Sequence, residues 1–273
     1  MRKRYLSNAT VGGLLLAFLV VCAILGAVWT PFDPLRIHFP TRLHPPGGVH
    51  LLGTDEFGRD ELSRLLSGAA TSFLIASLTV FFAIVLGCTI GLLAGFARGW
   101  TDRIIMTFNN AMLAFPGLLL ALGLLTIVGP NQYGIVLALC LAYTPSVVRV
   151  VRGAVMSLRE CEFVESSRVL GNSDLYTMFR HVLPNCIAPI SVLATSMFGW
   201  VILAESALSF LGLGVPPPAP TWGNMLASAR PFISQASYLS IFPGLCIALT
   251  LLAINLAGDA VRDRLDPRMR GMK

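Results

Sequence analysis

Residues 11–30, VGGLLLAFLVVCAILGAVWT, contain no charged side chain. An α-helix rises about 1.5 Å per residue, so a run of this length reaches across the apolar core of a bilayer, which is about 30 Å thick. Inside hydrocarbon the backbone finds no water, and a single segment satisfies its own N–H and C=O groups only as a helix. The run therefore predicts a transmembrane helix as the first element of an all-α integral membrane protein.

Five further apolar runs extend this pattern along the chain. The sequence predicts six transmembrane helices in a single domain, residues 1–273, with spans at about residues 11–30, 72–97, 104–129, 133–150, 186–210 and 238–258. Only 12% of the residues are charged, against about 25% in a typical soluble domain. The first run follows three basic residues, as a signal peptide does. It is longer than the usual apolar region of about 7 to 15 residues and lacks a clear cleavage site, so we interpret it as a span.

The basic residues are unevenly distributed between the two sides of these spans. Lysine and arginine accumulate in loops that stay in the cytoplasm. Fifteen of the 20 basic residues lie in the two terminal segments and in the loops after the second and fourth runs. Both termini and the polar segment 157–185 are therefore expected in the cytoplasm, with residues 31–71 as an outer loop. The net charge of +6 follows from this topology, so we expect a lipid environment and no nucleic-acid partner.

Several enzyme classes are excluded by missing residue patterns. The only lysines are Lys3 and Lys273, so a phosphate-binding loop with its lysine cannot form. Neither H-E-x-x-H nor G-x-S-x-G occurs, and no cofactor motif is present. His38, His44 and His50 recur at intervals of six residues, which suits no known metal-ligand pair. We expect no enzyme activity, cofactor or metal site, and keep metal contact by the outer histidines as an alternative.

Polar residues and prolines lie inside the predicted spans, and some of them are candidates for a transport path. Glu205 is a carboxylate at membrane depth, and such groups often mark a transport path. The candidate path residues are Asn109, Asn110, Pro116 and Glu205. Each has a structural alternative: helix–helix hydrogen bonding for the asparagines, ordinary bending of the span for the proline, and an interfacial position for the glutamate. An autonomous secondary carrier or channel for small polar solutes would use these residues as its site, although such a carrier usually has more ionisable groups. A membrane scaffold is a third possibility.

The segment FVESSRVLGNSDLYTMFRHVLPN, residues 163–185, is a polar interruption between two apolar runs. Its pattern predicts one helix over 157–170, a stop at Gly171, and a second helix over 174–181 that Pro184 prevents from continuing. The second helix has one apolar stripe, formed by Leu175, Met178, Phe179 and Val182. The segment 157–185 is therefore expected to form an amphipathic hairpin, which could rest on the lipid surface or bind a partner.

The hairpin resembles the EAA loop of ABC-importer permeases, which reads E-A-A, three residues, G, nine residues, I-x-L-P. The matching positions are Glu165, Ser166, Ser167, Gly171, His181, Leu183 and Pro184. The spacing agrees throughout, with serines in place of both alanines and a histidine in place of isoleucine. The form FRHVLPN is similar to that of peptide-type permeases. The resemblance implies that this hairpin couples the membrane spans to an ATPase.

Four more segments are similar to the C-type permease of dipeptide, oligopeptide and nickel importers. They are HLLGTDEFGRDELSRLLSGA (50–69), LAFPGLLLAL (113–122), AESALSFLGLGVPPPAPTWGNML (204–226) and FPGLCIALTLLAINLAGDAVRDRLDPR (242–268). The resemblance implies a type I importer permease fold in the inner membrane. It also implies a homologous second permease, two cytosolic ATPase subunits and an extracytoplasmic substrate-binding protein as partners. Peptides, or nickel or a metal chelate, would be the substrate, which the spans themselves do not encode. In this family His50 is expected to be structural.

Overall fold

The computed structural model describes residues 2–265, and within this range the chain is helical, without a β-strand. Five helices are long and apolar enough to cross a membrane: α1 (Arg2–Val28), α2 (Glu61–Ala97), α5 (Gln132–Leu158), α9 (Ile187–Phe210) and α11 (Tyr238–Leu265). A sixth apolar region is divided between α3 (Gly99–Leu113) and α4 (Gly117–Val128). The all-α membrane class predicted from the sequence is confirmed.

The third predicted span, residues 104–129, is broken rather than continuous. Helices α3 and α4 meet at an angle of 91°. Pro116 lies immediately before α4, with ψ of 126°, and has no N–H to donate to the preceding turn. The proline therefore separates two helices, which is a larger change than ordinary bending of one span.

Helix α2 begins earlier than the predicted run at residue 72. The carboxylate of Asp60 accepts a hydrogen bond from the N–H of Ser63 at 2.8 Å and so caps the helix at Glu61. The outer loop therefore ends at residue 60 rather than residue 71. With 37 residues, α2 is about 55 Å long and extends beyond the thickness of an apolar bilayer core.

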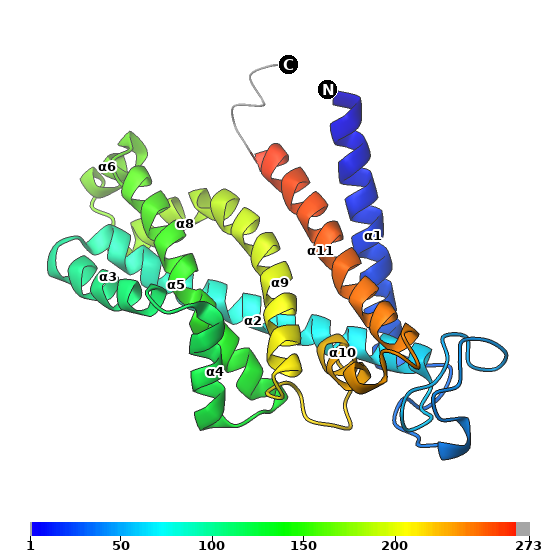
Figure 1. Ribbon diagram of the computed structural model, residues 1–273. Coiled ribbons are helices and arrows are strands. Elements are labelled where there is room, and N and C mark those ends of the chain that lie inside the picture. Colours follow the sequence, from blue (N-terminus) through cyan, green and yellow to red (C-terminus); the bar gives the residue numbers. More distant parts are fainter. Residues whose placement is uncertain (1, 266–273) are drawn as a thin grey trace.

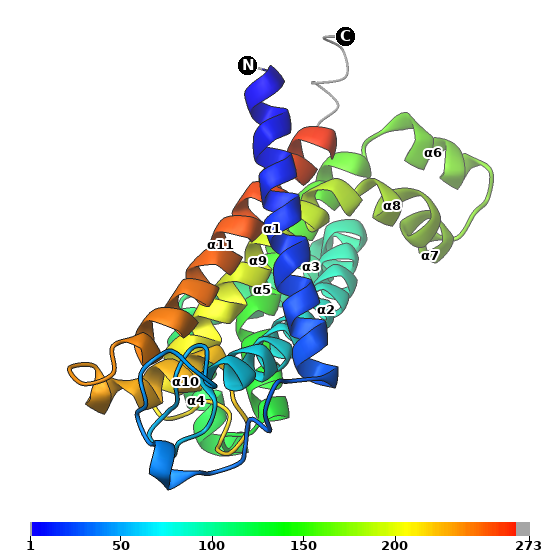
Figure 2. The same cartoon turned by 90° about the vertical axis from the view of Figure 1, so that its right-hand side faces the viewer.

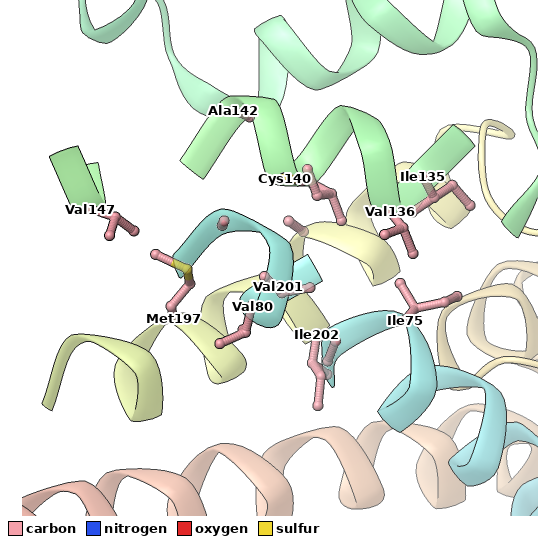
Figure 3. Close-up of a cluster of buried hydrophobic side chains, with 14 of the residues drawn as sticks. Ile75, Val80, Ile135, Val136, Cys140, Ala142, Val147, Met197, Val201 and Ile202 are labelled. Carbon is pink, nitrogen blue, oxygen red and sulfur yellow. The ribbon is translucent and has the colours of Figure 1, made fainter. Parts of the chain in front are cut away.

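Helices α2, α5 and α9 form the centre of the bundle, and Figure 3 shows side chains from all three in one buried cluster. Helix α2 contributes Ile75 and Val80, α5 contributes Cys140 and Val147, and α9 contributes Met197 and Val201. Along the contact between α2 and α5, glycines replace larger side chains at every fourth residue. A Cβ atom at Gly87 would lie 2.4 Å from the Cβ of Val147, and one at Gly95 would lie 2.7 Å from the Cβ of Val155. Small residues of this kind allow membrane helices to approach closely.

The short elements gather at the two ends of the bundle. One end holds the start of α1, the end of α11, and a hairpin made of α6 (Glu162–Val169), α7 (Asp174–Thr177), a π-helical turn (Met178–Val182) and α8 (Leu183–Asn185), as Figures 1 and 2 show. The opposite end holds the loop 29–60 with the 3-10 turn η1 (Phe39–Thr41), α4, α10 (Trp222–Ala229) and the turn η3 (Arg230–Phe232).

Candidate functional site

The bend of the hairpin is at Gly171, between α6 and α7. Gly171 has φ of +80°, a conformation that residues with a side chain rarely adopt. Its N–H donates to the carbonyl of Arg168 at 2.9 Å, and the next N–H, of Asn172, donates to the carbonyl of Ser167 at 3.2 Å. A Cβ atom here would meet nothing within 4 Å. Glycine is therefore required for its backbone conformation and not for space.

The prediction that Pro184 stops the second helix was wrong. After α7 the chain makes a π-helical turn, in which the N–H of Leu183 donates to the carbonyl of Met178, five residues earlier. Pro184 then lies in the first turn of α8, where its missing N–H removes no helical hydrogen bond. The chain continues through α8 into α9, so the hairpin is attached to the bundle by near-continuous helix.

The hairpin has an inner face that is buried and an outer face that is exposed. Val164, Met178 and Val182 belong to the same apolar core as the spans, and beside them the hydroxyls of Ser167 and Thr177 lie 2.9 Å apart. The predicted apolar stripe is divided between the two faces: Met178 and Val182 pack against the bundle, whereas Leu175 and Phe179 are exposed. The outward apolar side chains are Val169, Leu170 (79% exposed), Leu175 and Phe179 (55% exposed), which we call the outer apolar face.

The charged and polar side chains of the hairpin differ in how they are engaged. Glu165 and Ser166 are exposed, and within residues 2–265 Glu165 makes no ion pair. Arg168, three residues after Glu165, lies 3.7 Å from Asp174 and 4.9 Å from the centre of the Phe96 ring. The His181 ring contacts the Tyr176 ring edge to face, Leu183 is half-buried and Pro184 is exposed. Glu165 is thus available for a contact with another chain.

The two candidate asparagines both connect α3 to α5. Nδ2 of buried Asn109 donates to the carbonyl of Pro145 at 3.2 Å. Oδ1 of Asn110 accepts from Arg149 at 3.1 Å, and this pair is exposed. Helix–helix hydrogen bonding therefore occupies both side chains, while only the second pair lies at the surface of the chain.

Glu205 is 1% exposed and lies deep between α9 and α10, not at an interface with water. Its Oε1 accepts hydrogen bonds from the hydroxyls of Ser209 and Thr221, each at 2.8 Å. Thr221 is also the N-cap of α10, whose positive end favours a nearby carboxylate. A Cβ atom at Gly223 would lie 3.0 Å from the other carboxylate oxygen. The pairing with Thr221 was missed from the sequence, since only the packing of α10 on α9 brings the two together.

The outer loop contains a compact network of buried charges. Asp55 accepts from Nε of Arg59 at 2.6 Å and lies 3.2 Å from Nε of Arg64. Nδ1 of His50 lies 2.9 Å from Asp60, which agrees with the structural role expected for that histidine. Burial raises the pKa of Glu56 beside this network. Within residues 2–265, no three histidine, cysteine or acidic side chains are arranged to hold a metal ion.

Comparison with known proteins relates this architecture to transport systems. Residues 87–271 match the family described as "Binding-protein-dependent transport system inner membrane component". The chain is 45% identical over 271 residues to the di/tripeptide transport system permease protein of Pseudomonas aeruginosa, covering 97% of this chain and 89% of that one. It is 42% identical over 270 residues to a putative peptide transport system permease protein of Brucella suis, covering 99% and 90%.

The glutathione transport system permease protein of Pectobacterium atrosepticum is 39% identical over 271 residues, covering 98% of this chain and 90% of that one. Among solved structures, a chain of the inward-facing MetNI methionine ABC transporter superposes with a TM-score of 0.60 at 19% sequence identity. The match covers 74% of this chain and 96% of that one. The chain therefore resembles transport permeases in its fold as well as in its sequence.

Proposed function

The chain belongs to the family of inner membrane components of binding-protein-dependent transport systems, and from this premise we propose that it is one permease subunit of an ATP-driven importer of peptides. The relatives described above are named for peptide and glutathione transport, which favours peptides over the nickel alternative. The chain has no phosphate loop, so ATP hydrolysis belongs to two partner ATPases. A second permease and a substrate-binding protein complete the assembly.

The outer apolar face of the hairpin carries this proposal. Leu170, Leu175 and Phe179 project from the end of the bundle, on a segment that also displays the unpaired carboxylate of Glu165. Burying one such side chain in a partner contributes about 1.5 to 3 kcal/mol. An amphipathic helix that fits a groove of the ATPase uses this combination of apolar anchors and charge. The hairpin is accordingly the coupling element through which ATP-driven closure reaches the spans.

This role requires the hairpin to lie in the cytoplasm. The start of α1, which carries Arg2, Lys3 and Arg4, lies at the same end of the bundle as the hairpin, and this supports that orientation. In a cysteine-free background, a cysteine at position 172 is expected to react with a membrane-impermeant maleimide only after permeabilisation. A cysteine at exposed position 45 is expected to react in intact cells. Labelling of position 172 from outside would reverse the orientation.

Among the polar residues of the spans, we assign Asn110 and Pro116 to the transport path, because both are exposed on this chain. Asn109 and Glu205 face inward and hold helices together through the hydrogen bonds described above. An autonomous carrier would need Glu205 free to bind its ion or solute. Two hydroxyls occupy Oε1 of Glu205, and its Oε2, which has no hydrogen-bond partner within residues 2–265, is buried with the rest of the side chain at 1% exposure; this burial speaks against that alternative.

The test of the coupling role is Gly171→Val, with Glu165→Lys as an independent variant. Valine at φ of +80° costs on the order of 1 to 2 kcal/mol and should misalign the two arms of the hairpin. Reversing the charge of Glu165 should oppose docking without altering the hairpin. Both variants are expected to insert and bind the second permease, but to lose the ATPases on copurification and to lose uptake in proteoliposomes.

The matched control is Gly153→Val in α5, where a Cβ atom also meets nothing within 4 Å but the backbone is helical. This control should retain the ATPases. If Gly171→Val and Glu165→Lys both retain the ATPases and transport at the parental rate, the hairpin is a lipid-surface element and the coupling proposal is rejected.

A further inference from the structure

The carboxyl-terminal end of α2 contacts the hairpin, since the guanidinium of Arg168 in α6 lies 4.9 Å from the centre of the Phe96 ring in α2. The last four carbonyl groups of any α-helix have no partner within the helix, and for α2 these include the carbonyl of Gly95. Beyond Ala97 the chain reverses at Arg98 and Gly99, both with positive φ, so α2 cannot be extended to satisfy them. The end of α2 therefore needs a donor from another segment.

Arg159 supplies that donor. It is the first residue after α5, and its Nη1 donates to the carbonyl of Gly95 at 2.6 Å. A guanidinium at this position also complements the negative end of the α2 dipole. The close approach of α2 to α5 at this point requires glycine at position 95. A Cβ atom there would lie 2.7 Å from the Cβ of Val155 and 3.1 Å from the carbonyl of Arg152.

The hairpin is joined to the same end of α2 by packing. Arg168 of α6 lies over the ring of Phe96, and Phe96, Val155 and Val164 belong to one continuous buried cluster. The junction between α5 and α6 is thus fixed to α2 by a charged hydrogen bond on one side and by apolar contacts on the other.

The opposite end of α2 is held equally firmly in the outer loop. Asp60 caps the helix and contacts His50, and Arg64 in the first turn lies 3.2 Å from Asp55. Between these ends, the glycines at positions 87, 91 and 95 hold α2 against α5 with no room for a side chain. One continuous helix of about 55 Å therefore connects the hairpin to the outer loop.

We propose that Arg159 is a positioning residue for transport, which fixes the hairpin to α2 so that a displacement of the hairpin moves α2 and, through it, the outer loop. The inference rests on the proposed function, because it assumes that the hairpin receives movement from an ATPase. It adds the route by which that movement reaches the far side of the membrane. Arg159 itself touches neither the substrate nor the outer apolar face.

The test uses Arg159→Met, which keeps the length of the side chain and removes its donors, and Arg159→Lys, which keeps the charge and one donor direction. The assembled importer is reconstituted in proteoliposomes with its ATPases and binding protein. Arg159→Met is expected to retain the ATPases and to hydrolyse ATP near the parental rate. Uptake should fall at least about tenfold, because losing a hydrogen bond to a charged group typically changes an equilibrium constant by more than a factor of about ten. Arg159→Lys should be intermediate.

A distance measurement separates this positioning role from a general defect. Spin labels at Thr89 on α2 and Glu162 on α6, both exposed, report how firmly the two elements are joined. The parent should give one narrow distance with and without ATP, whereas Arg159→Met should give a broad distribution. The control is Arg98→Met, which removes only an exposed ion pair with Glu160 and should behave as the parent.

Two results overturn the inference. One is a narrow distance and parental uptake in Arg159→Met. The other is loss of the ATPases from this variant, which would mean that Arg159 supports docking of the ATPases and not the transmission of movement from the hairpin to α2. If Gly171→Val still abolishes docking in either case, the proposed function stands and only this inference fails. If Arg159→Met does not accumulate, Arg159→Gln serves for the same measurements.

Discussion

The hairpin and the outer loop are both polar excursions between spans, yet they use their charges in opposite ways. The outer loop turns the charges of its residues 55–60 largely inward: Asp55 is 3% exposed and is shared between Arg59 and Arg64. The hairpin turns its charges outward, with Glu165 exposed and Arg168 in a loose pair with Asp174. Ion pairs within the outer loop thus hold that loop, whereas the body of the hairpin is held mainly by uncharged buried side chains such as Val164, Met178 and Val182.

This difference separates a segment that completes the fold of this chain from one that is completed by another chain. A buried ion pair fixes a loop in one geometry, because either charge alone is strongly destabilising. Exposed charges next to exposed apolar side chains contribute little to folding and are suited to a partner. Hydrogen exchange of backbone amides in the two segments measures the stability of each one separately, so it can test the contrast directly.

The largest effect is expected in the outer loop, from Asp55→Ala. The substitution leaves Arg59 and Arg64 buried without their shared partner, which typically costs about 3 to 5 kcal/mol. Amides of residues 53–60 should exchange at least about a hundredfold faster, while amides of the hairpin should not change.

Asp33→Ala is the control within the same loop, since Asp33 is exposed and, within residues 2–265, its carboxylate accepts only from the N–H of Leu35. Its effect on exchange should be small. Equal acceleration by Asp33→Ala and Asp55→Ala would mean that the buried ion pairs do not hold the loop.

A smaller effect is expected at the inner face of the hairpin, from Val164→Ala. Val164 is fully buried, and removing two methyl groups from a packed core costs about 2 kcal/mol. Exchange of the hairpin amides should become faster, with the outer loop unaffected. Val169→Ala, on the outer apolar face, should leave exchange unchanged in the isolated chain and weaken retention of the ATPases. If Val169→Ala accelerates exchange while Val164→Ala only weakens retention of the ATPases, the outer apolar face holds the hairpin in place and the inner face binds the partner.

The spans were predictable from the sequence because apolar length is a local property. The five long helices overlap five of the expected runs, and Gly171 was identified as the bend from its position between two short helical patterns. The helix predicted over 157–170 is divided, because α5 extends to Leu158 and α6 begins only at Glu162. The early start of α2 was missed although Asp60 is a good capping residue. Glu61 and Arg64 are polar and suggested a loop, but the charge network of the outer loop buries both.

The details that were missed depend on contacts between distant segments or on an irregular turn. The role of Pro184 depends on the π-helical turn, which no local pattern indicated. The engagement of Glu205 by Thr221 depends on how α10 packs on α9. The bond from Arg159 to the carbonyl of Gly95 joins residues far apart in the chain, so it becomes visible only once α2 and α5 are placed side by side.

The smallest predicted effect concerns Ser167, where this chain has serine instead of the second alanine of the E-A-A pattern. Its hydroxyl is buried, lies 2.9 Å from the hydroxyl of Thr177 and accepts from Nδ2 of Asn172 at 3.2 Å. Ser167→Ala removes this bond between α6 and α7 and leaves the buried hydroxyl of Thr177 without its partner, which should cost about 1 to 2 kcal/mol. Asn172 is only half-buried, so it can turn to water.

The double variant Ser167→Ala with Thr177→Val distinguishes a hydrogen bond from simple packing. Removing both hydroxyls leaves no unsatisfied polar group, so exchange of the hairpin amides should return most of the way to the parental rate. Thr177→Val alone should have a smaller effect than Ser167→Ala, since the Ser167 hydroxyl still accepts from Nδ2 of Asn172. If the double variant is instead as unstable as the sum of the two single variants, the hydroxyls act independently. The serine would then contribute nothing specific to the joining of α6 and α7.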